Sequence, residues 1–267
     1  MKELKFNLRF LLRKKELYYA IIVILLINLL HVIFVVKDSS CLAETCRSGE
    51  YQFILNNHFV QFTPMVVLVF PIVCALIFSD TSWCDIKYGT GNLLYTRVNY
   101  KKNILVRLVL TFLVSFLIVF IGVILNYATL RFIFGTGNVT THAQSTGFYL
   151  NSLPDRFLDS TRLSNPQLYA VLLCGHISLI IALLVTVSYS FSFFIKQRIF
   201  IYFLPVFLII LFAFIFPFIG FSSLSFLQQL QPLTVFSYKD AFISYLLLFS
   251  FSIFGIVKYF LRRNNML

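Results

Sequence analysis

Long apolar runs alternate with short polar segments along this chain, and the runs determine the class of protein. A helix needs about 20 apolar residues to cross a bilayer. Because backbone groups in lipid must form hydrogen bonds within their own segment, we expect each run of that length to be a membrane-spanning helix. Six such runs, without Asp or Glu between their ends, are Leu17–Val36, Phe59–Ser79, Ile104–Asn126, Leu168–Ile195, Ile199–Phe221 and Ala241–Tyr259.

The composition agrees with one all-α integral membrane domain over residues 1–267. Hydrophobic residues make up 59% of the chain and charged residues 12%, whereas a soluble domain has about 25% charged residues. The basic N-terminus precedes a long apolar run without a small-residue cleavage site. We therefore expect Leu17–Val36 to stay as a membrane anchor rather than to be removed as a signal peptide.

The basic residues set the expected orientation in a bacterial plasma membrane. Most of the 22 Lys and Arg residues lie in the N-terminal segment, the loop after the second span, the turn at residues 196–198 and the C-terminal end. Basic loops stay in the cytoplasm, so we expect both termini inside and the loops 37–58, 131–167 and 222–240 outside. Topology accounts for the net charge of +12, which therefore does not imply nucleic-acid binding.

The segment before the first span has the pattern of an amphipathic helix. With 100° per residue, its leucines share one face and its cations another, and such a helix is expected to lie in the membrane interface. The alternative is a basic flank that only sets the topology. The two faces consist of Leu4, Leu8, Leu11 and Leu12, and of Lys2, Lys5, Arg9 and Arg13.

The loop between the second and third spans, "FSDTSWCDIKYGTGNLLYTRVNYKKN", is the longest polar passage in the first half of the chain. Asp80 and Ser82 are good helix N-caps, and Gly89 or Gly91 can end a helix through a positive φ. The pattern predicts a helix of one to two turns near Thr81–Tyr88.

This short helix is expected to present aromatic and charged side chains, which are typical of a protein interface. The presented residues are Trp83, Ile86, Lys87 and Tyr88. The alternative is a simple turn whose neighbouring cations, Lys101, Lys102 and Arg107, bind lipid phosphates.

Taken together, these features resemble the membrane-spanning subunits of type-2 ABC exporters. In that family an amphipathic elbow helix leads into six spans, and a coupling helix between spans 2 and 3 docks on the ATPase. The resemblance extends over nearly the whole chain and rests on the architecture and on "ALIFSD", a polar turn and "IKYGTGNLLYTRVNYKKNIL" before the third span. The matching positions are Asp80 and Asp85, Gly89 and Gly91, Leu93–Leu94, and Arg97–Lys102. The family often has Glu where this chain has Trp83-Cys84-Asp85.

The resemblance implies partners and a role. It implies two copies of a separate ATPase subunit that bind ATP and Mg, a second permease subunit that is identical or related, and contact with membrane lipids. It also implies export of an amphipathic or antimicrobial peptide, or of another hydrophobic compound, in resistance or self-immunity. The ATPase-coupling residues would be Trp83, Asp85, Ile86, Lys87, Tyr88 and Gly89.

The chain lacks the motifs of an enzyme. None of its ten Gly residues is followed by Lys, so there is no P-loop, and ATP hydrolysis is expected in a separate subunit. There is also no H-E-x-x-H, no G-x-S-x-G and no intramembrane carboxylate pair, and we expect no metal site. The lack of membrane carboxylates also argues against a proton-coupled carrier.

Polar side chains inside the spans mark candidate positions for a cavity lining. The alternative is packing, since hydroxyl groups often join transmembrane helices, and we expect His176 to be a satisfied interhelical histidine. The candidates are Asn28 and His31 in the first span and Ser178, Thr186, Ser188, Ser190 and Ser192 in the fourth. In the fifth span, Pro205 and Pro217 are expected to bend or break the helix, with a short re-entrant segment up to Leu233.

Two of the outside loops carry further expectations. Cys41 and Cys46 can form a disulfide on the oxidising side of the membrane, and free thiols are the alternative. The loop 131–167 is expected to contain a short helix that lies on the outer surface or caps the pore, with a mobile loop as the alternative. Two rival functions remain open: a membrane immunity or sensor protein that binds a peptide at its outer face without an ATPase, and a secondary carrier.

Overall fold

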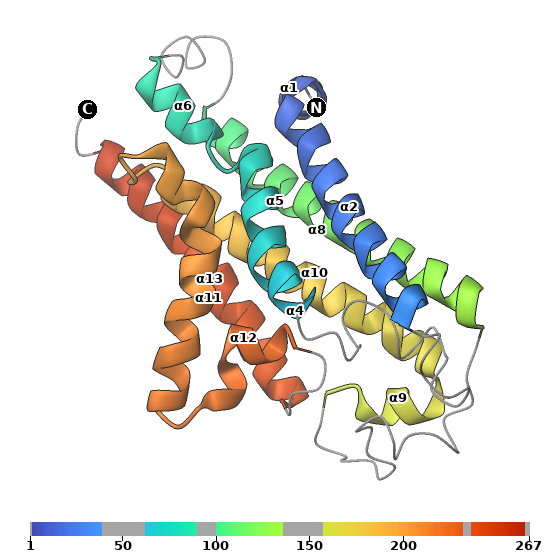
Figure 1. Cartoon of the computed structure of the whole chain (residues 1–267). Helices are drawn as coiled ribbons and strands as arrows, with labels where there is room; N and C mark the ends of the chain where they lie inside the picture. The colour runs from blue at the N-terminus through green and yellow to red at the C-terminus, as the bar shows by residue number, and fades with distance from the viewer. Residues whose placement is uncertain (1, 39–61, 90–99, 136–156, 232–235, 265–267) are drawn as a thin grey trace.

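Long helices form a single bundle in the computed structural model (Figure 1). The structure describes residues 2–38, 62–89, 100–135, 157–231 and 236–264, and these segments contain no β-strand. Among these residues, five helices have the length and composition to cross a membrane. They are α2 (Lys15–Asp38), α8 (Tyr100–Phe134), α10 (Pro166–Phe191), α11 (Arg198–Phe218) and α13 (Tyr238–Asn264).

These five helices match five of the six predicted spans. The largest difference is at the end of α8, which continues eight residues beyond the predicted end at Asn126. The added residues, "YATLRFIF", contain no helix breaker, and the helix stops before Gly135, which has a φ of +74°. A positive φ is the usual way for glycine to end a helix.

The second predicted span is built from three shorter helical pieces. They are α4 (Phe62–Pro64), the π-helix η2 (Met65–Val69) and α5 (Phe70–Phe78); residues 59–61 lie outside the described residues. The π-helix precedes Pro71, which has no N–H for the carbonyl four residues earlier. Together with α6 (Thr81–Lys87), Met65–Phe78 forms a pair bent by 44° that makes a sixth candidate span if it is counted as one.

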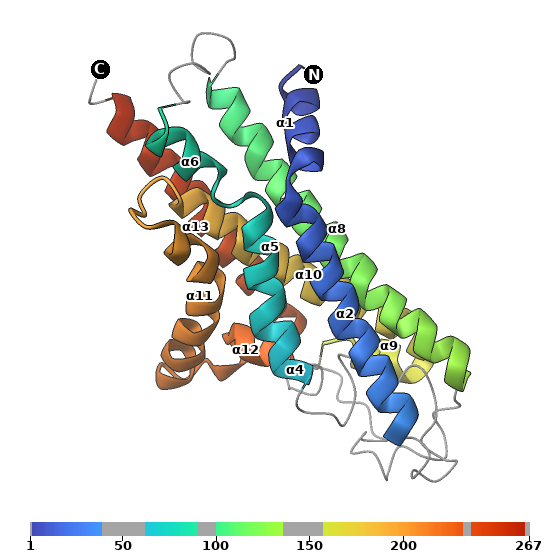
Figure 2. The same ribbon diagram turned by 45° about the horizontal axis from the view of Figure 1, so that its top comes forward.

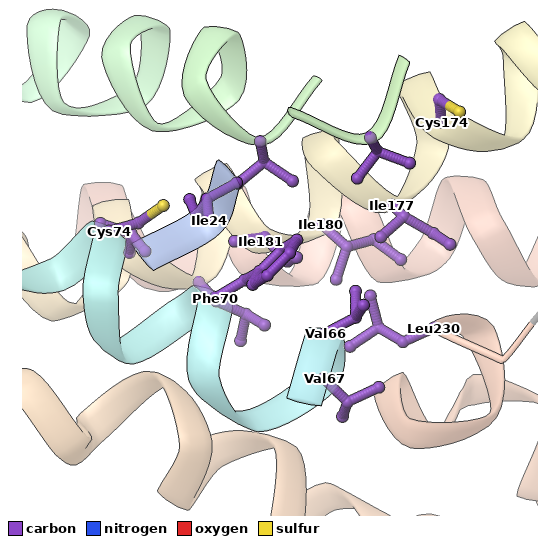
Figure 3. Close-up of a cluster of buried hydrophobic side chains, with 14 of the residues drawn as sticks. Ile24, Val66, Val67, Phe70, Cys74, Cys174, Ile177, Ile180, Ile181 and Leu230 are labelled. Atoms are coloured by element: carbon purple, nitrogen blue, oxygen red, sulfur yellow. The ribbon is translucent and has the colours of Figure 1, made fainter. Parts of the chain in front are cut away.

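The central helix of the bundle is α10, most of which is buried. It packs against α8, α13, α11 and α5. Figure 3 shows part of this core, where Ile177, Ile180 and Ile181 of α10 meet Phe70 of α5 and Ile24 of α2. This arrangement explains why the apolar pattern of α10 runs around the whole helix, since a helix that is apolar on all sides is surrounded by other apolar groups.

Close helix packing depends on glycine at two positions. A Cβ atom added at Gly255 of α13 would lie 3.1 Å from the carbonyl oxygen of Ser190 in α10. At Gly122 of α8, an added Cβ would lie 2.5 Å from a methyl group of Ile24 in α2, which is too close. Small residues at such positions let membrane helices approach each other.

Pro205 does not interrupt α11, which runs unbroken from Arg198 to Phe218. The prediction of a break at Pro205 was therefore wrong, whereas a bend there stays a prediction; Pro217 lies next to the last residue. Proline at 205 leaves the carbonyl of Ile201 without its usual donor. The hydroxyl of Ser188 in α10 donates a hydrogen bond to this carbonyl. A neighbouring helix thus supplies the missing partner, as membrane proteins often require.

The bundle has two distinct ends (Figure 2). The first residues of α1 (Lys2–Arg13), the last residues of α13 and the helix α6 lie together, and we call this the α6 end. The short helices α4, α9 (Asp159–Ser164) and α12 (Phe226–Gln229) lie at the opposite end, which we call the α9 end.

At the α9 end, polar groups are buried among aromatic rings. His176 of α10 has partners on both ring nitrogens, the hydroxyl of Tyr245 and the backbone oxygen of Gln229 at 3.2 Å. The Gln229 amide nitrogen donates to the hydroxyl of Ser244 at 2.7 Å. His176 is thus a satisfied interhelical histidine, as predicted. α9 agrees with the short helix predicted in the loop 131–167, of which residues 136–156 lie outside the described residues.

Candidate functional site

The short helix predicted in the loop after the second span is present as α6. It begins after Asp80 and ends at Lys87, and Gly89 follows with a φ of +68°. Asp80 occupies the N-cap position, but its side chain makes no capping hydrogen bond. The expectation of a side-chain cap from Asp80 was therefore wrong, because its carboxylate has other partners.

The carboxylate of Asp80 is fully buried and binds groups from two other parts of the chain. The Lys14 ammonium, at the junction of α1 and α2, donates from 3.1 Å. From α11, the Arg198 guanidinium donates from 2.8 Å and the Tyr202 hydroxyl from 3.0 Å. Burial alone would raise the pKa of Asp80, but the charges of Lys14 and Arg198 outweigh it and lower this pKa below its ordinary value.

A second network holds the middle of α6. The Asp85 carboxylate forms an ion pair with the buried guanidinium of Arg107 in α8. The Arg107 Nε also donates to the side-chain oxygen of Asn7 in α1 at 2.9 Å, and the Asn7 amide donates to Asn103 of α8 at 2.7 Å. The alternative in which Arg107 binds lipid phosphates is wrong, since only 6% of its side chain is exposed.

The indole ring of Trp83 fixes α6 against the turn between α10 and α11. Its Nε1 donates to the backbone oxygen of Lys196 at 3.1 Å, and the Lys87 ammonium lies 4.5 Å from the ring centroid. Trp83 is only 8% exposed. The prediction that this helix presents Trp83 was wrong, because the turn at Lys196 covers the ring.

The exposed surface of α6 lies at its C-terminal end. The side chains of Ile86 and Tyr88 are 51% and 66% exposed, and Lys87 and Gly89 are also exposed. We call Ile86, Lys87, Tyr88 and Gly89 the α6 tip. A small apolar and aromatic surface beside a cation thus lies at the end of a helix that binds α8 and the α10–α11 turn, and that follows Asp80, which binds Lys14 and α11.

Residues 90–99, which include Gly91, Leu93–Leu94 and Arg97, lie outside the described residues. The cations that follow them belong to the first turn of α8. Lys101 lies 6.0 Å from the ring centroid of Phe260, and Lys102 lies 3.9 Å from the Glu3 carboxylate. The start of α8 is thus in contact with both α1 and α13.

Most of the leucines and cations that were predicted to form the two faces of α1 are exposed on the surface of the bundle. Of the leucines, only Leu11 is buried, whereas Leu4, Leu8 and Leu12 are about half exposed, as are Phe6 and Phe10. The cations Lys5, Arg9 and Arg13 are exposed. Asn7, which sequence reasoning did not single out, is the buried contact to α8.

The polar candidates in the first span have different surroundings. Asn28 of α2 is part of the wall of a groove between α2 and α8. His31 is fully buried, and its Nδ1 lies 3.1 Å from the amide nitrogen of Asn126 in α8. The same amide nitrogen donates to the backbone oxygen of Asn28 at 3.1 Å.

The polar stripe of α10, which ends at the C-cap residue Ser192, is buried in the bundle. Each of its five hydroxyls donates to a backbone carbonyl. Four bonds stay within α10, and only that of Ser188 reaches another helix. The residues are Ser178, Thr186, Ser188, Ser190 and Ser192.

The cysteines and possible metal ligands add no further site in the described part of the chain. Cys41 and Cys46 lie outside it, so their predicted disulfide stays a prediction. Cys74 and Cys174 are buried and, like Cys84, are free thiols. No group of three His, Cys, Asp or Glu side chains in this part is placed to hold a metal ion.

Comparisons of the chain with models of protein families, with curated proteins and with solved structures found no match.

Proposed function

We propose that this chain is the transmembrane subunit of an ATP-driven exporter of the type-2 ABC kind and that it couples to a separate ATPase through α6. In this proposal both termini and the α6 end face the cytoplasm, and α1 is the elbow helix in the inner membrane interface. The cargo is an amphipathic compound, for which antimicrobial peptides are the leading class. Two ATPase subunits and a second permease subunit complete the transporter.

One observation supports the proposal most strongly: the α6 tip is exposed, whereas Asp80, Trp83 and Asp85, which we call the α6 base, are bound to other parts of the chain. A coupling element must offer a surface to a soluble partner and must also transmit displacement. The α6 tip offers the surface. The α6 base binds α11 through Asp80, the α10–α11 turn through Trp83, and α8 through Asp85.

The contacts of α6 indicate how force would spread. When the ATPases close on ATP, they would push the α6 tip toward the bundle. The Asp80 and Asp85 carboxylates would then carry α11 and α8 along, and Lys14 and Asn7 would transmit the motion to α1 and α2. Because these charge-assisted contacts bring together helices from both halves of the chain, a push at one point would tilt several spans at once.

The experiment is copurification of ATPase activity with the tagged chain from its native host. We expect ATP hydrolysis to elute with the wild-type chain and to be lost, by about tenfold or more, from Ile86→Asp/Tyr88→Asp, because each removed anchor of an interface can cost more than 1 kcal/mol.

The matched control is Leu261→Asp, which changes an aliphatic residue at the same end of the bundle. Leu261 is 61% exposed, compared with 51% for Ile86, and lies near the end of α13. The control should retain the ATPase. Full retention by the α6 double variant, or wild-type chain without any ATPase, would contradict the proposal and favour the immunity or carrier alternatives.

A further inference from the structure

Exposed cations line a seam at the α6 end, where the turn between α10 and α11 lies beside the last turns of α13 (Figures 1 and 2). Lys258 and Arg262 of α13 are four residues apart and thus share one face of the helix. Lys196 belongs to the turn, where its backbone oxygen accepts a hydrogen bond from Trp83. We call Lys196, Lys258 and Arg262 the seam cations; all are exposed.

Two aromatic rings place the ammonium group of Lys258 between α13 and the turn. Its Nζ lies 5.7 Å from the ring centroid of Phe194 in the turn and 5.8 Å from that of Phe254, one helical turn earlier on α13. Aromatic faces attract a cation at such distances. They accept no conventional hydrogen bond, so the N–H donors of Lys258 stay available for an anion.

No carboxylate balances the charge of the seam in the part of the chain that the structure describes. None of the seam cations forms an ion pair there. The acids of the adjoining α6 segment are bound elsewhere. Asp80 pairs with Lys14 and Arg198, and Asp85 pairs with Arg107. The seam therefore has a positive charge that no described side chain neutralises.

The seam lies at the border between the apolar and the polar surface of the bundle. Lys258 is the last residue but one of the predicted span Ala241–Tyr259. On its apolar side, Phe254 and Val257 are 56% and 46% exposed. Beyond the turn, Ile199 of α11 is 58% exposed. Phospholipids have their phosphates at this border and their acyl chains along the apolar surface.

We infer that the seam binds the headgroup of an anionic phospholipid. The phosphate contacts the seam cations, and the first part of the acyl chains lies on Phe254 and Val257. Basic pockets between membrane helices are typical sites for anionic headgroups, and the guanidinium of Arg262 can donate to two phosphate oxygens at once. A zwitterionic headgroup fits less well, because it brings a cation of its own to a surface that is already positive.

The test is a lipid titration of the purified full-length chain in a nonionic detergent, followed by native mass spectrometry. The probes are dioleoylphosphatidylglycerol, which is anionic, and dioleoylphosphatidylcholine, which has the same chains and no net charge. We expect the anionic lipid to bind about twentyfold more tightly at its tightest site, and Lys258→Gln/Arg262→Gln to lose most of this preference, since each cation contributes about fivefold.

The controls separate a site from a general effect of charge. Lys15→Gln/Lys239→Gln removes two exposed lysines outside the seam and should keep the preference. Lys258→Arg/Arg262→Lys retains both charges and should also keep it. Thermal unfolding without added lipid checks that each variant is folded. The single variants Lys258→Gln and Arg262→Gln, each with a loss of about fivefold, keep the inference testable if the double variant does not fold.

Three results would overturn the inference. They are equal binding of the two lipids by the wild-type chain, an unchanged preference in Lys258→Gln/Arg262→Gln, and equally tight binding of soluble glycerol phosphate. The last result would show that the seam takes a free phosphate rather than a lipid. The titration requires no ATPase, so its outcome is independent of the proposed coupling through α6.

Discussion

The Lys14 ammonium lies 3.1 Å from the Asp80 carboxylate, although the two residues are 66 positions apart in the chain. This contact joins the junction of α1 and α2 to the junction of α5 and α6. Arg198, which is 118 positions from Asp80, binds the same carboxylate. One buried anion thus holds three helix junctions at the α6 end.

Removal of Lys14 should weaken the bundle. Lys14→Met leaves the buried Asp80 carboxylate with fewer partners, and breaking a buried ion pair costs about 3–5 kcal/mol; we expect a smaller loss because Arg198 and Tyr202 remain. Lys15→Met, at an exposed neighbouring position, is the matched control and should change little. Thermal unfolding in detergent measures both. In an Asp80→Asn background, Lys14→Met should cost much less, and equal losses in both backgrounds would contradict the assignment.

Ser188 should stabilise α11 more strongly when Pro205 is present. The Ser188 hydroxyl satisfies the Ile201 carbonyl, which Pro205 deprives of its usual donor. Ser188→Ala should therefore cost about 0.6–2 kcal/mol, the range for hydrogen bonds between membrane helices. Pro205→Ala restores a backbone N–H, so the same serine change should cost less in that background. A double-mutant cycle by chemical unfolding measures this coupling, and a value near zero would contradict it.

Gly255 should not tolerate a methyl group. An added Cβ would lie 3.0–3.2 Å from three atoms of Ser190, two of them backbone atoms that cannot turn away. We expect Gly255→Ala to lower the unfolding temperature. Gly175→Ala in α10 is the control, because an added Cβ there meets only the Phe120 ring at 3.9 Å. It should not lower the unfolding temperature, since Ala is a better helix former than Gly. Equal effects would show that α10 and α13 are less closely packed.

The α6 tip should be accessible only from the cytoplasm. In a variant with the five native cysteines replaced by Ser, we expect Tyr88→Cys to react with a membrane-impermeant maleimide in inside-out vesicles but not in intact cells. Tyr238 is 48% exposed and is the first residue of α13, whose last residues lie at the α6 end. Tyr238→Cys should therefore show the reverse pattern. Labelling of Tyr88→Cys in intact cells would contradict the orientation on which the proposed function depends.

Local sequence patterns were sufficient to predict much of the fold. The apolar runs predicted the five long helices, and Gly89 was one of two glycines expected to end α6, because both features depend on a few adjacent residues. The continuity of α11 at Pro205 could not be predicted, for the opposite reason. The carbonyl that Pro205 leaves without its usual donor binds Ser188, a residue of another helix, and no local pattern reports such a neighbour.

The contacts that bind α6 to the rest of the bundle could not be predicted from the sequence. Asn7, Lys14 and Tyr202 stand in ordinary basic or apolar surroundings, and only the packed bundle brings them to Asp80 or Arg107. Trp83 was expected to be exposed because it lies in a polar loop. Its burial follows from a turn that comes more than a hundred residues later in the chain. One signal was present: Asp80 and Asp85 are acids within otherwise basic segments.

Photocross-linking from the α6 tip tests the central claim most directly. Tyr88 is replaced by p-benzoylphenylalanine in the tagged chain, and native membranes are illuminated with and without ATP. The account predicts a cross-linked product that contains a nucleotide-binding subunit, in an amount that changes with ATP, and no such product from the same group at Leu261. Illumination that captures lipid alone, or the ATPase equally from both positions, would contradict it.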